Sequence, residues 1–173
     1  MRLLYILLFL LSLGLQAKDC LKHPIYCQIL KNSPRINKKH ALRVSNIIYK
    51  MHRKYKIPSK IFTAILRQEN NYRLSSNREQ CGYTKEGVKQ CIYTDFGISQ
   101  IYWANIDAYK LDLKKLNTDL EYSIEAGAVV LRDKMKRFKK KEREWYLRYN
   151  CGNRGSIKKD TCQTYKRKIE RYY

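Results

Sequence analysis

The stretch IPSKIFTAILRQENNY, residues 57–72, decides the fold class of this 173-residue chain. Pro58 and Ser59 are typical of a helix start, and apolar residues then recur at helical spacing. Glu69 follows Ile65 by four residues and therefore ends the apolar stripe of the predicted helix. Because burial disfavours the charged form of a carboxyl group, Glu69 is a candidate proton donor near neutral pH. A Glu at a helix end can instead turn into water, and the stripe alone favours that ordinary interpretation.

The N-terminus has the pattern of a secretory signal peptide over residues 1–17. Arg2 supplies a positive charge, Leu3–Leu15 is mostly apolar, and an acceptable cleavage site ends at Ala17. The apolar run is shorter than the about 20 residues that a membrane helix needs, so we expect no permanent span after the signal is removed. The predicted location is periplasmic or secreted.

Two segments follow the predicted cleavage site. Residues 18–36 read as a short cysteine-containing lead-in that includes two prolines. Residues 37–173 are long enough for one domain with a core of its own, and they contain no internal repeat or low-complexity linker. We therefore expect a single domain behind the lead-in.

The cysteines indicate an oxidising compartment. Six of them follow the predicted signal, and an even number in an exported chain is typical of disulfides. No pair has the close spacing of a zinc site and the histidines are scattered, so neither a metal nor a cofactor is expected. From proximity alone, the predicted disulfides are Cys20–Cys27, Cys81–Cys91 and Cys151–Cys162.

The charge is strongly basic. Lys and Arg number 37 against 15 acids, a formal net charge of +22, and the densest run is KMKRFKKKER at 134–143. Such a surface favours a polyanion: nucleic acid, anionic lipid or a cell-wall polymer. Basic residues interleaved with fifteen tyrosines also suit nucleic-acid binding, so a non-catalytic cationic binding protein is the main alternative to an enzyme. Export argues against a stable nucleic-acid partner.

Hydrophobic periodicity and turn residues predict a mainly α (α+β) domain with one small β region. Residues 73–95 are polar and contain Gly82 and Gly87, so we expect a loop or small hairpin there. Small residues at 126–128 predict the close approach of another helix. Besides residues 57–72, the predicted helices are one that Asn37 caps and that runs to about Tyr55, a short one over Gly97–Tyr109, a long one started by a capping box of Thr118 and Glu121, and two at about 142–149 and 161–171.

Three motifs occur in a suggestive order: AILRQENNY at 64–72, DFGISQI at 95–101 and RYNCG at 148–152. Together they resemble the Glu-Ser, Gly-Leu-Met-Gln and Ala-Tyr-Asn-Ala-Gly blocks of the soluble lytic transglycosylase (SLT) domain. The resemblance covers roughly residues 37–173, including the closing stretch YKRKIERYY, and is nearest to small exported members that serve secretion systems, conjugation or phage. It implies a lysozyme-like helical domain, here disulfide-stapled, with peptidoglycan glycan strands as partner and substrate.

The resemblance also implies roles for individual residues. Glu69 would act first as the acid and then as the base in cleaving the bond between N-acetylmuramic acid and N-acetylglucosamine. Gln100, Tyr149 and Asn150 would line the sugar cleft or orient Glu69, and Ser99 is counted with them as substrate-binding. A trans-envelope secretion or conjugation complex is a possible partner.

The chain departs from the family pattern at several positions. Asn70 stands where the family has Ser, so an amide replaces a hydroxyl group beside the acid. Ser99 stands where the family has Met, which removes an apolar wall from the cleft. Cys151 replaces Ala and, if bridged to Cys162, would staple the loop of Tyr149 to the last helix.

The second carboxylate that most glycosidases use has one natural candidate, Asp95. We expect Asp95 to cap the helix that starts at Phe96 or Gly97, because Asp is a preferred N-cap residue. If Glu69 acts alone, the substrate's N-acetyl group can serve as the nucleophile, and the C6 hydroxyl can then close a 1,6-anhydro ring. The alternative is a lysozyme-type hydrolase that uses Asp95.

Aromatic residues near the motifs leave two interpretations open. Tyr102, Trp103 and Trp145 could stack on sugar rings, but aromatics at helical spacing more often belong to the core. None of the three is therefore assigned to the site.

Overall fold

A computed structural model describes residues 20–74, 78–83, 89–153 and 157–173, with the backbone alone over 78–83 and 89–92. The predicted signal peptide of residues 1–17 lies outside these ranges. Within them, no helix is both long enough and apolar enough to cross a membrane.

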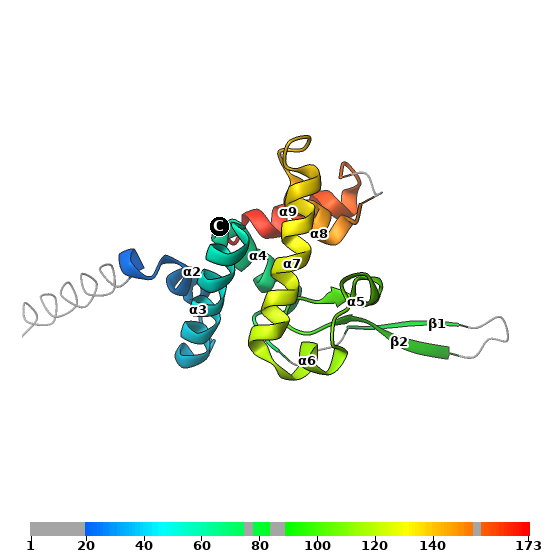
Figure 1. Ribbon diagram of the computed structural model, residues 1–173, viewed down its shortest axis with the longest axis horizontal. Helices are drawn as coiled ribbons and strands as arrows, with labels where there is room; N and C mark the ends of the chain where they lie inside the picture. The colour runs from blue at the N-terminus through cyan, green and yellow to red at the C-terminus, as the bar shows by residue number, and fades with distance from the viewer. Residues whose placement is uncertain (1–19, 75–77, 84–88, 154–156) are drawn as a thin grey trace, which may run out of the picture.

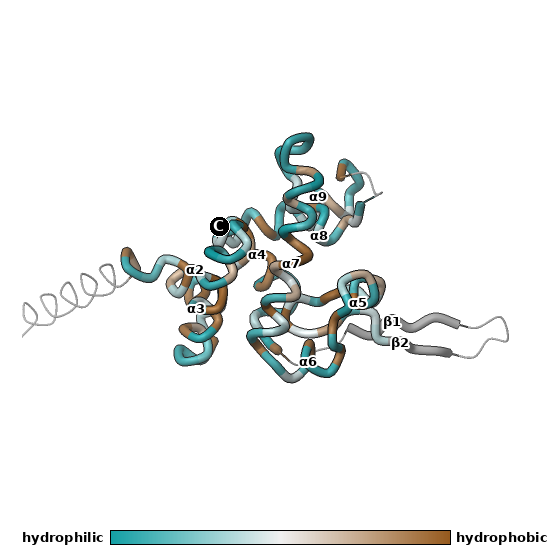
Figure 2. The backbone as a smooth tube through the Cα atoms, in the orientation of Figure 1, coloured by the Kyte–Doolittle hydropathy of each residue, from teal (hydrophilic) through white to brown (hydrophobic). Residues whose placement is uncertain are grey.

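The structure is mostly helical, and several of its helices pack against the predicted helix of residues 57–72 (Figure 1). That helix is α4, Ser59–Asn70, and it contacts α2, α3 and α9. Brown, hydrophobic tube segments in α3 and α4 lie toward each other in Figure 2, as expected for helices that bury one apolar face. The helices are α2 (Pro24–Asn32), α3 (Lys38–Tyr55), α4 (Ser59–Asn70), α5 (Trp103–Tyr109), α6 (Leu113–Thr118), α7 (Leu120–Phe138), the 3₁₀ helix η1 (Trp145–Leu147), α8 (Arg148–Cys151) and α9 (Asp160–Glu170).

The N-terminal helices confirm the predicted start of the helical part. Asn37 caps α3, because its side-chain oxygen accepts a hydrogen bond from the backbone N–H of His40 at 3.1 Å. The lead-in is not a loose segment: α2 buries Ile25 and Ile29 in the main core. The Cys20–Cys27 disulfide, with an S–S distance of 2.02 Å, ties the start of this segment to α2.

A small antiparallel sheet forms in the predicted β region. Among the described residues, the strands are ordered β1 (Arg78–Tyr83), β2 (Lys89–Phe96) and β3 (Ile101–Tyr102). The register places Cys81 directly opposite Cys91. Their side chains lie outside the described part of the structure, so this disulfide stays a prediction. The Cys151–Cys162 disulfide is confirmed, with an S–S distance of 2.10 Å.

A second, smaller core joins the sheet to α7. Helices α5 and α6 cover it, and Leu116 of α6 is fully buried. The buried residues of this core are Phe96, Ile101, Leu116, Ala126 and Val130. Helix α7 therefore belongs to both cores and connects the two sides of the molecule.

The prediction of a helix over Gly97–Tyr109 is wrong in its first half. Gly97 has φ +71° and Gln100 has φ +45°, so residues 97–100 form a turn that reverses the chain. Phe96 then pairs with Ile101 across the turn, and α5 begins only at Trp103. Because no helix starts at Gly97, the predicted capping role of Asp95 is also wrong.

The capping box of Thr118 and Glu121 is wrong as well, although a long helix does begin there. Asp119 is the N-cap of α7, since its side chain accepts from the backbone N–H groups of Glu121 and Tyr122. Thr118 is the last residue of α6 and donates to the carbonyl oxygen of Lys114. Asp caps at least as well as Thr, and α6 already holds Thr118.

Candidate functional site

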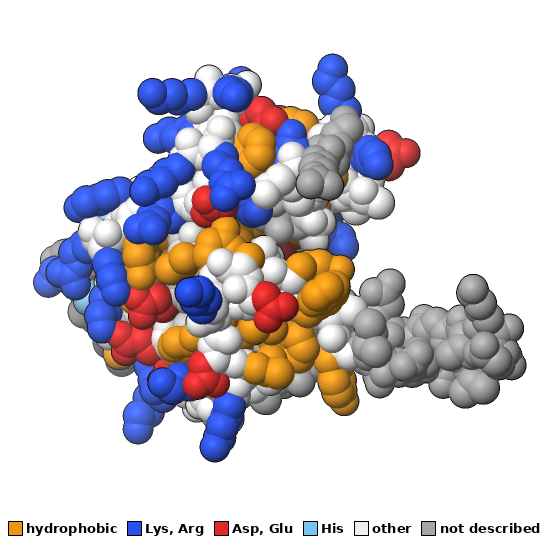
Figure 3. Space-filling model, turned by 45° about the vertical axis from the view of Figure 1, so that its right-hand side comes forward, with side chains coloured by type: hydrophobic (Ala, Val, Ile, Leu, Met, Phe, Trp, Pro, Cys, Tyr) orange, Lys and Arg blue, Asp and Glu red, His pale blue; other side chains and the backbone are white. Residues whose placement is uncertain are grey.

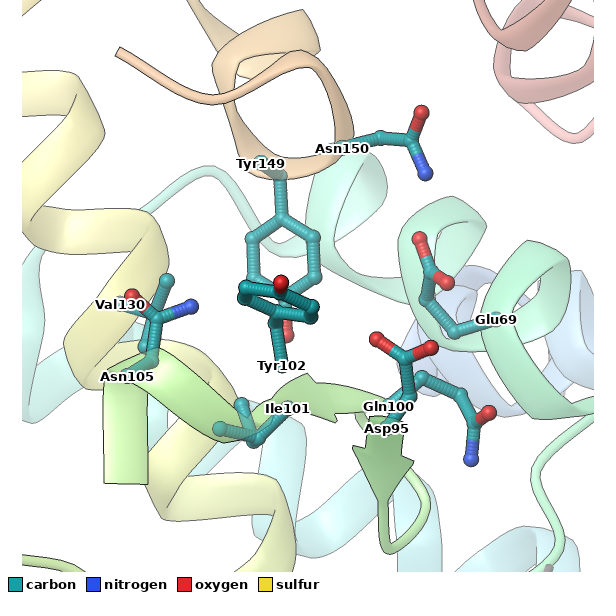
Figure 4. Close-up of a pocket in the computed structure, with 9 residues that line it drawn as sticks. All are labelled: Glu69, Asp95, Gln100, Ile101, Tyr102, Asn105, Val130, Tyr149 and Asn150. Carbon is teal, nitrogen blue, oxygen red and sulfur yellow. The ribbon is translucent and has the colours of Figure 1, made fainter. Parts of the chain in front are cut away.

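A groove lies between α4 and the sheet, at the ends of α4, β2 and α8 (Figure 4). Its open cavity has a volume of about 100 Å³. Side chains from both sides of the molecule line it: Glu69, Asp95, Gln100, Ile101, Tyr102, Asn105, Val130, Tyr149 and Asn150. Residues far apart in sequence thus meet at one site.

Glu69 is placed in the groove by the end of α4. Asn71 takes the left-handed conformation and ends the helix two residues later, while the turns before Glu69 bury Ile65 and Leu66 in the main core. The Glu69 side chain is half-buried, and its Oε1 accepts a hydrogen bond of 2.6 Å from the hydroxyl group of Tyr165. The carboxyl group therefore faces a lined cavity and is fixed by a buried tyrosine.

The side chain of Asn70, beside Glu69, forms a hydrogen bond with the backbone. Its Nδ2 donates to the carbonyl oxygen of Arg73 at 2.7 Å and supports the turn after α4. The amide that replaces the family's serine is thus used in part to shape the end of the helix that carries Glu69.

Tyr149 forms the wall of the groove opposite its mouth. Its hydroxyl group donates to the carbonyl oxygen of Ser99 at 2.8 Å. Burial, followed by the nearby negative charge of Glu69 and more weakly that of Asp95, raises the pKa of Tyr149 well above its ordinary value. Tyr149 is therefore a neutral donor that ties α8 to the 97–100 turn, and both carboxyl groups are close enough to influence it.

Gln100 and Asn150 also line the groove. Gln100 is largely buried, and its Nε2 donates to the carbonyl oxygen of Gly97 at 2.9 Å. This bond stabilises the turn. Asn150 reaches the cavity from α8, in the residue next to Tyr149 (Figure 4).

Ser99 does not reach the groove. It is fully buried, and its hydroxyl group donates to the carbonyl oxygen of Ser123 at 2.8 Å. The turn points its side chain at Gly127, where an added Cβ would lie 2.3 Å from the Ser99 Oγ. The close neighbour of the small residues of α7 is therefore this turn, together with Tyr149, and Ser99 supports the site from behind.

Asp95 lies in the groove instead of capping a helix. It is paired with Tyr102 in the β2–β3 register, and its Oδ2 accepts from the hydroxyl group of Thr94 at 2.9 Å. Figure 4 shows the carboxyl groups of Glu69 and Asp95 directed into the same space from opposite sides. Most glycosidases use a pair of carboxyl groups that flank the bond to be cleaved.

Sequence reasoning missed Tyr165 and left Tyr102 unassigned. Tyr165 was named only as part of a closing stretch, although its position on the buried face of α9 with Ile169 was a usable signal. Tyr102 could have been found only through the strand register that sets it opposite Asp95. In the described ranges, no three His, Cys, Asp or Glu side chains cluster as a metal site would require.

Comparison with known families places these residues in context. A model of the transglycosylase SLT domain matches residues 46–173, from the middle of α3 to the last residue. Neither the curated proteins nor the solved structures gave a match. The matched range contains every residue that lines the groove, and the chain belongs to the transglycosylase SLT domain family, in the lysozyme-like superfamily.

Proposed function

We propose that this protein is a peptidoglycan lytic transglycosylase and that Glu69 is its acid and then its base. Membership of the SLT family supports a lytic transglycosylase that acts on peptidoglycan. The observation that carries the assignment to Glu69 is its carboxyl group, held by Tyr165 and directed into the groove.

In the first step, protonated Glu69 gives its proton to the oxygen that links N-acetylmuramic acid to N-acetylglucosamine. The carbonyl oxygen of the muramic N-acetyl group forms a bond to the anomeric carbon as the glycosidic bond breaks. The product is a cyclic oxazolinium ion next to the ionised Glu69. Tyr165 then donates its hydrogen bond to a carboxylate, which stabilises that charge.

In the second step, Glu69 takes the proton of the C6 hydroxyl group of the same sugar. The C6 oxygen attacks the anomeric carbon, the oxazolinium ring opens, and a 1,6-anhydromuramyl end forms without water. Glu69 is protonated again, so the cycle closes. The attack is intramolecular and therefore has the orientation advantage that a free water molecule lacks.

Asp95 supports a second candidate, a lysozyme-type hydrolase. Its place in the groove opposite Glu69 is where a second carboxylate would be needed. In that mechanism Asp95 would act as the nucleophile or activate a water molecule, and the product would carry an ordinary reducing end. The chemistry of the product therefore separates the two candidates.

We further propose that the protein works outside the cytoplasm. The N-terminal pattern of a signal peptide and the Cys20–Cys27 and Cys151–Cys162 disulfides support export to an oxidising compartment. Local opening of the wall for a secretion, conjugation or phage system would suit a small exported enzyme. A non-catalytic polyanion binder would not need a carboxyl group held in a groove.

The decisive experiment is digestion of purified peptidoglycan, with the released muropeptides analysed by mass spectrometry. The wild-type protein should give anhydro ends, lighter than hydrolysed ends by the mass of one water. Glu69→Gln should lower the rate by about 10³-fold or more while it keeps the fold, because the amide has no acidic proton to transfer. Asp95→Asn should stay within about tenfold of wild type if the substrate supplies the nucleophile.

The two other outcomes are equally clear. Reducing ends, together with a loss in Asp95→Asn as large as that in Glu69→Gln, would establish the hydrolase. Undiminished cleavage by a folded Glu69→Gln protein would refute the assignment of the acid.

A further inference from the structure

Three large aromatic side chains are exposed together on the sheet side of the groove. The exposed fractions are 55% for Tyr93, 46% for Tyr102 and 49% for Trp103, whereas Trp145 is a core residue at 5%. Figure 3 shows hydrophobic side chains, in orange, gathered beside the base of the β1–β2 hairpin, while Lys and Arg crowd the opposite side. Isolated exposed aromatics are ordinary, but a group of them marks a binding surface.

The strand register explains why these side chains form one surface. Tyr102 is directly opposite Asp95, and Tyr93 lies two residues before Asp95 on β2, across an irregularity in the β1–β2 register at Thr94. Tyr93 therefore lies two residues from the position on β2 that pairs with Tyr102. Trp103 adjoins them, since its ring centroid lies 5.6 Å from that of Tyr102 at an interplanar angle of 51°.

This surface continues the groove. Tyr102 belongs to both, because it lines the cavity together with Asp95 and Asn105. In Figure 4 the ring of Tyr102 stands at the mouth of the cavity, in front of Tyr149. A chain lying in the groove that left it past Tyr102 would therefore pass over Trp103 or Tyr93.

The chemistry of the surface favours a neutral ring with one apolar face. Among the described residues, no Lys or Arg lines the groove, although the chain as a whole is strongly basic. Aromatic rings offer large, rigid contact area, while Asp95 and Asn105 at the edge can bond hydroxyl and acetamido groups. An N-acetylated hexose has this combination of an apolar C–H face and polar edges.

We propose that Tyr93, Tyr102 and Trp103 form an additional sugar subsite, here called the aromatic platform. It stacks against an N-acetylhexosamine ring of the glycan strand that is not itself cleaved. This inference rests on the proposed function, since it assigns the ligand to the same groove. It makes the protein select long glycan strands over short fragments.

Tryptophan fluorescence gives a direct test, because Trp103 and Trp145 are the two tryptophans of the chain. The Glu69→Gln protein, which is expected not to cleave a glycan, is titrated with N-acetylglucosamine oligomers. A hexamer should shift the emission of the exposed Trp103 to shorter wavelength in a saturable way, and a dimer should bind at least about tenfold more weakly.

Variants of the platform then measure its contribution by calorimetry. Trp103→Ala in the Glu69→Gln background should weaken hexamer binding by about tenfold and remove the emission shift. Tyr173→Ala is the matched control, because Tyr173 is similarly exposed, at 47%, but is the last residue of the sequence and does not line the groove. It should leave hexamer binding unchanged.

Equal hexamer affinity in Trp103→Ala, Tyr93→Ala and the parent protein would overturn the platform, as would a parent protein that binds no hexamer. An emission shift that depends on protein concentration without sugar would assign the surface to a second copy of the chain instead. Failure of the proposed function looks different, since wild-type protein would then leave peptidoglycan uncut while hexamer binding persisted.

Discussion

The two sides of the groove are built in different ways. The helical side supplies Glu69 from a helix packed within the large main core, to which α2, α3, α4, α7 and α9 all contribute. The sheet side supplies Asp95 and Tyr102 from short strands over a small core. Glu69 is therefore held on the side with the larger core, and Asp95 and Tyr102 are held on the side with less buried apolar area behind them.

The 97–100 turn is where the two sides are joined. The backbone N–H of Ile98 donates to the hydroxyl group of Ser123 on α7 at 3.0 Å, and Ser99 donates to the Ser123 carbonyl oxygen. Tyr149 binds the same turn from α8. We therefore predict that a substitution in the 97–100 turn will affect the groove more than a substitution elsewhere that costs the same free energy of unfolding.

The largest effect is expected from Gly97→Ala. An added Cβ would lie 2.2 Å from the Ser123 Oγ and 2.4 Å from the backbone oxygen of Leu116, at a residue with φ +71°. Strain and overlap together should lower the free energy of unfolding by about 4 kcal/mol. Chemical denaturation measures this value.

Gly152→Ala is the control for backbone strain alone. Gly152 has φ +68°, but nothing lies within 4 Å of an added Cβ. Gly152→Ala should lower the free energy of unfolding by about 2 kcal/mol. The difference between the two variants therefore measures the steric crowding around Gly97. Equal costs for both would show that the turn has room to move and that the two sides are less tightly joined than described.

The two described disulfides should separate stability from activity. Cys20–Cys27 and Cys151–Cys162 span 7 and 11 residues, so replacing either pair by serines should cost a similar free energy of unfolding, about 3 kcal/mol. Only Cys151–Cys162 joins α8, which carries Tyr149 and Asn150, to α9, which carries Tyr165.

The Cys151→Ser, Cys162→Ser protein should therefore lose peptidoglycan cleavage beyond what its stability explains, by about tenfold at a temperature where it is fully folded. The Cys20→Ser, Cys27→Ser protein should keep its rate under the same conditions. If the two double variants change the rate equally, the Cys151–Cys162 disulfide has no special effect on the site.

The same contrast explains what the sequence could and could not predict. Helices α3 and α4 were predictable because apolar periodicity agreed with a local start signal, the capping Asn37 for α3 and Pro58 for α4. Residues 97–101, GISQI, satisfy a helical pattern equally well, and only the left-handed Gly97 and the pairing of Phe96 with Ile101 decide for a turn. Local pattern was sufficient on the helical side and insufficient on the sheet side.

The residues of the site also differ in how far local sequence could predict their positions. The apolar stripe of α4 indicated Glu69 as a residue of interest, but only the family resemblance, which rests on three separate motifs, predicted that it lies in a cleft. Its partner Tyr165 lies 96 residues away, and Asp95 enters the groove only because β2 continues past it into a turn. Contacts of this kind depend on how the elements pack, which no local pattern encodes.

The smallest predicted effect tests how Glu69 is held. Tyr165→Phe removes the 2.6 Å hydrogen bond to the carboxyl group and leaves the aromatic ring in the core. Tyr165 positions Glu69 without lining the groove, so kcat should fall by about tenfold, equivalent to about 1.4 kcal/mol, with KM unchanged. Steady-state cleavage of soluble glycan strands gives both constants.

Tyr146→Phe is the matched control for this last change. Tyr146 is also buried, and its hydroxyl group contacts Glu170 at 3.4 Å, away from the groove. Removing that hydroxyl group should cost about as much stability, roughly 1 kcal/mol, without changing kcat. If Tyr165→Phe behaves like Tyr146→Phe, the end of α4 alone fixes the acid, and the contribution of α9 to the site is limited to packing.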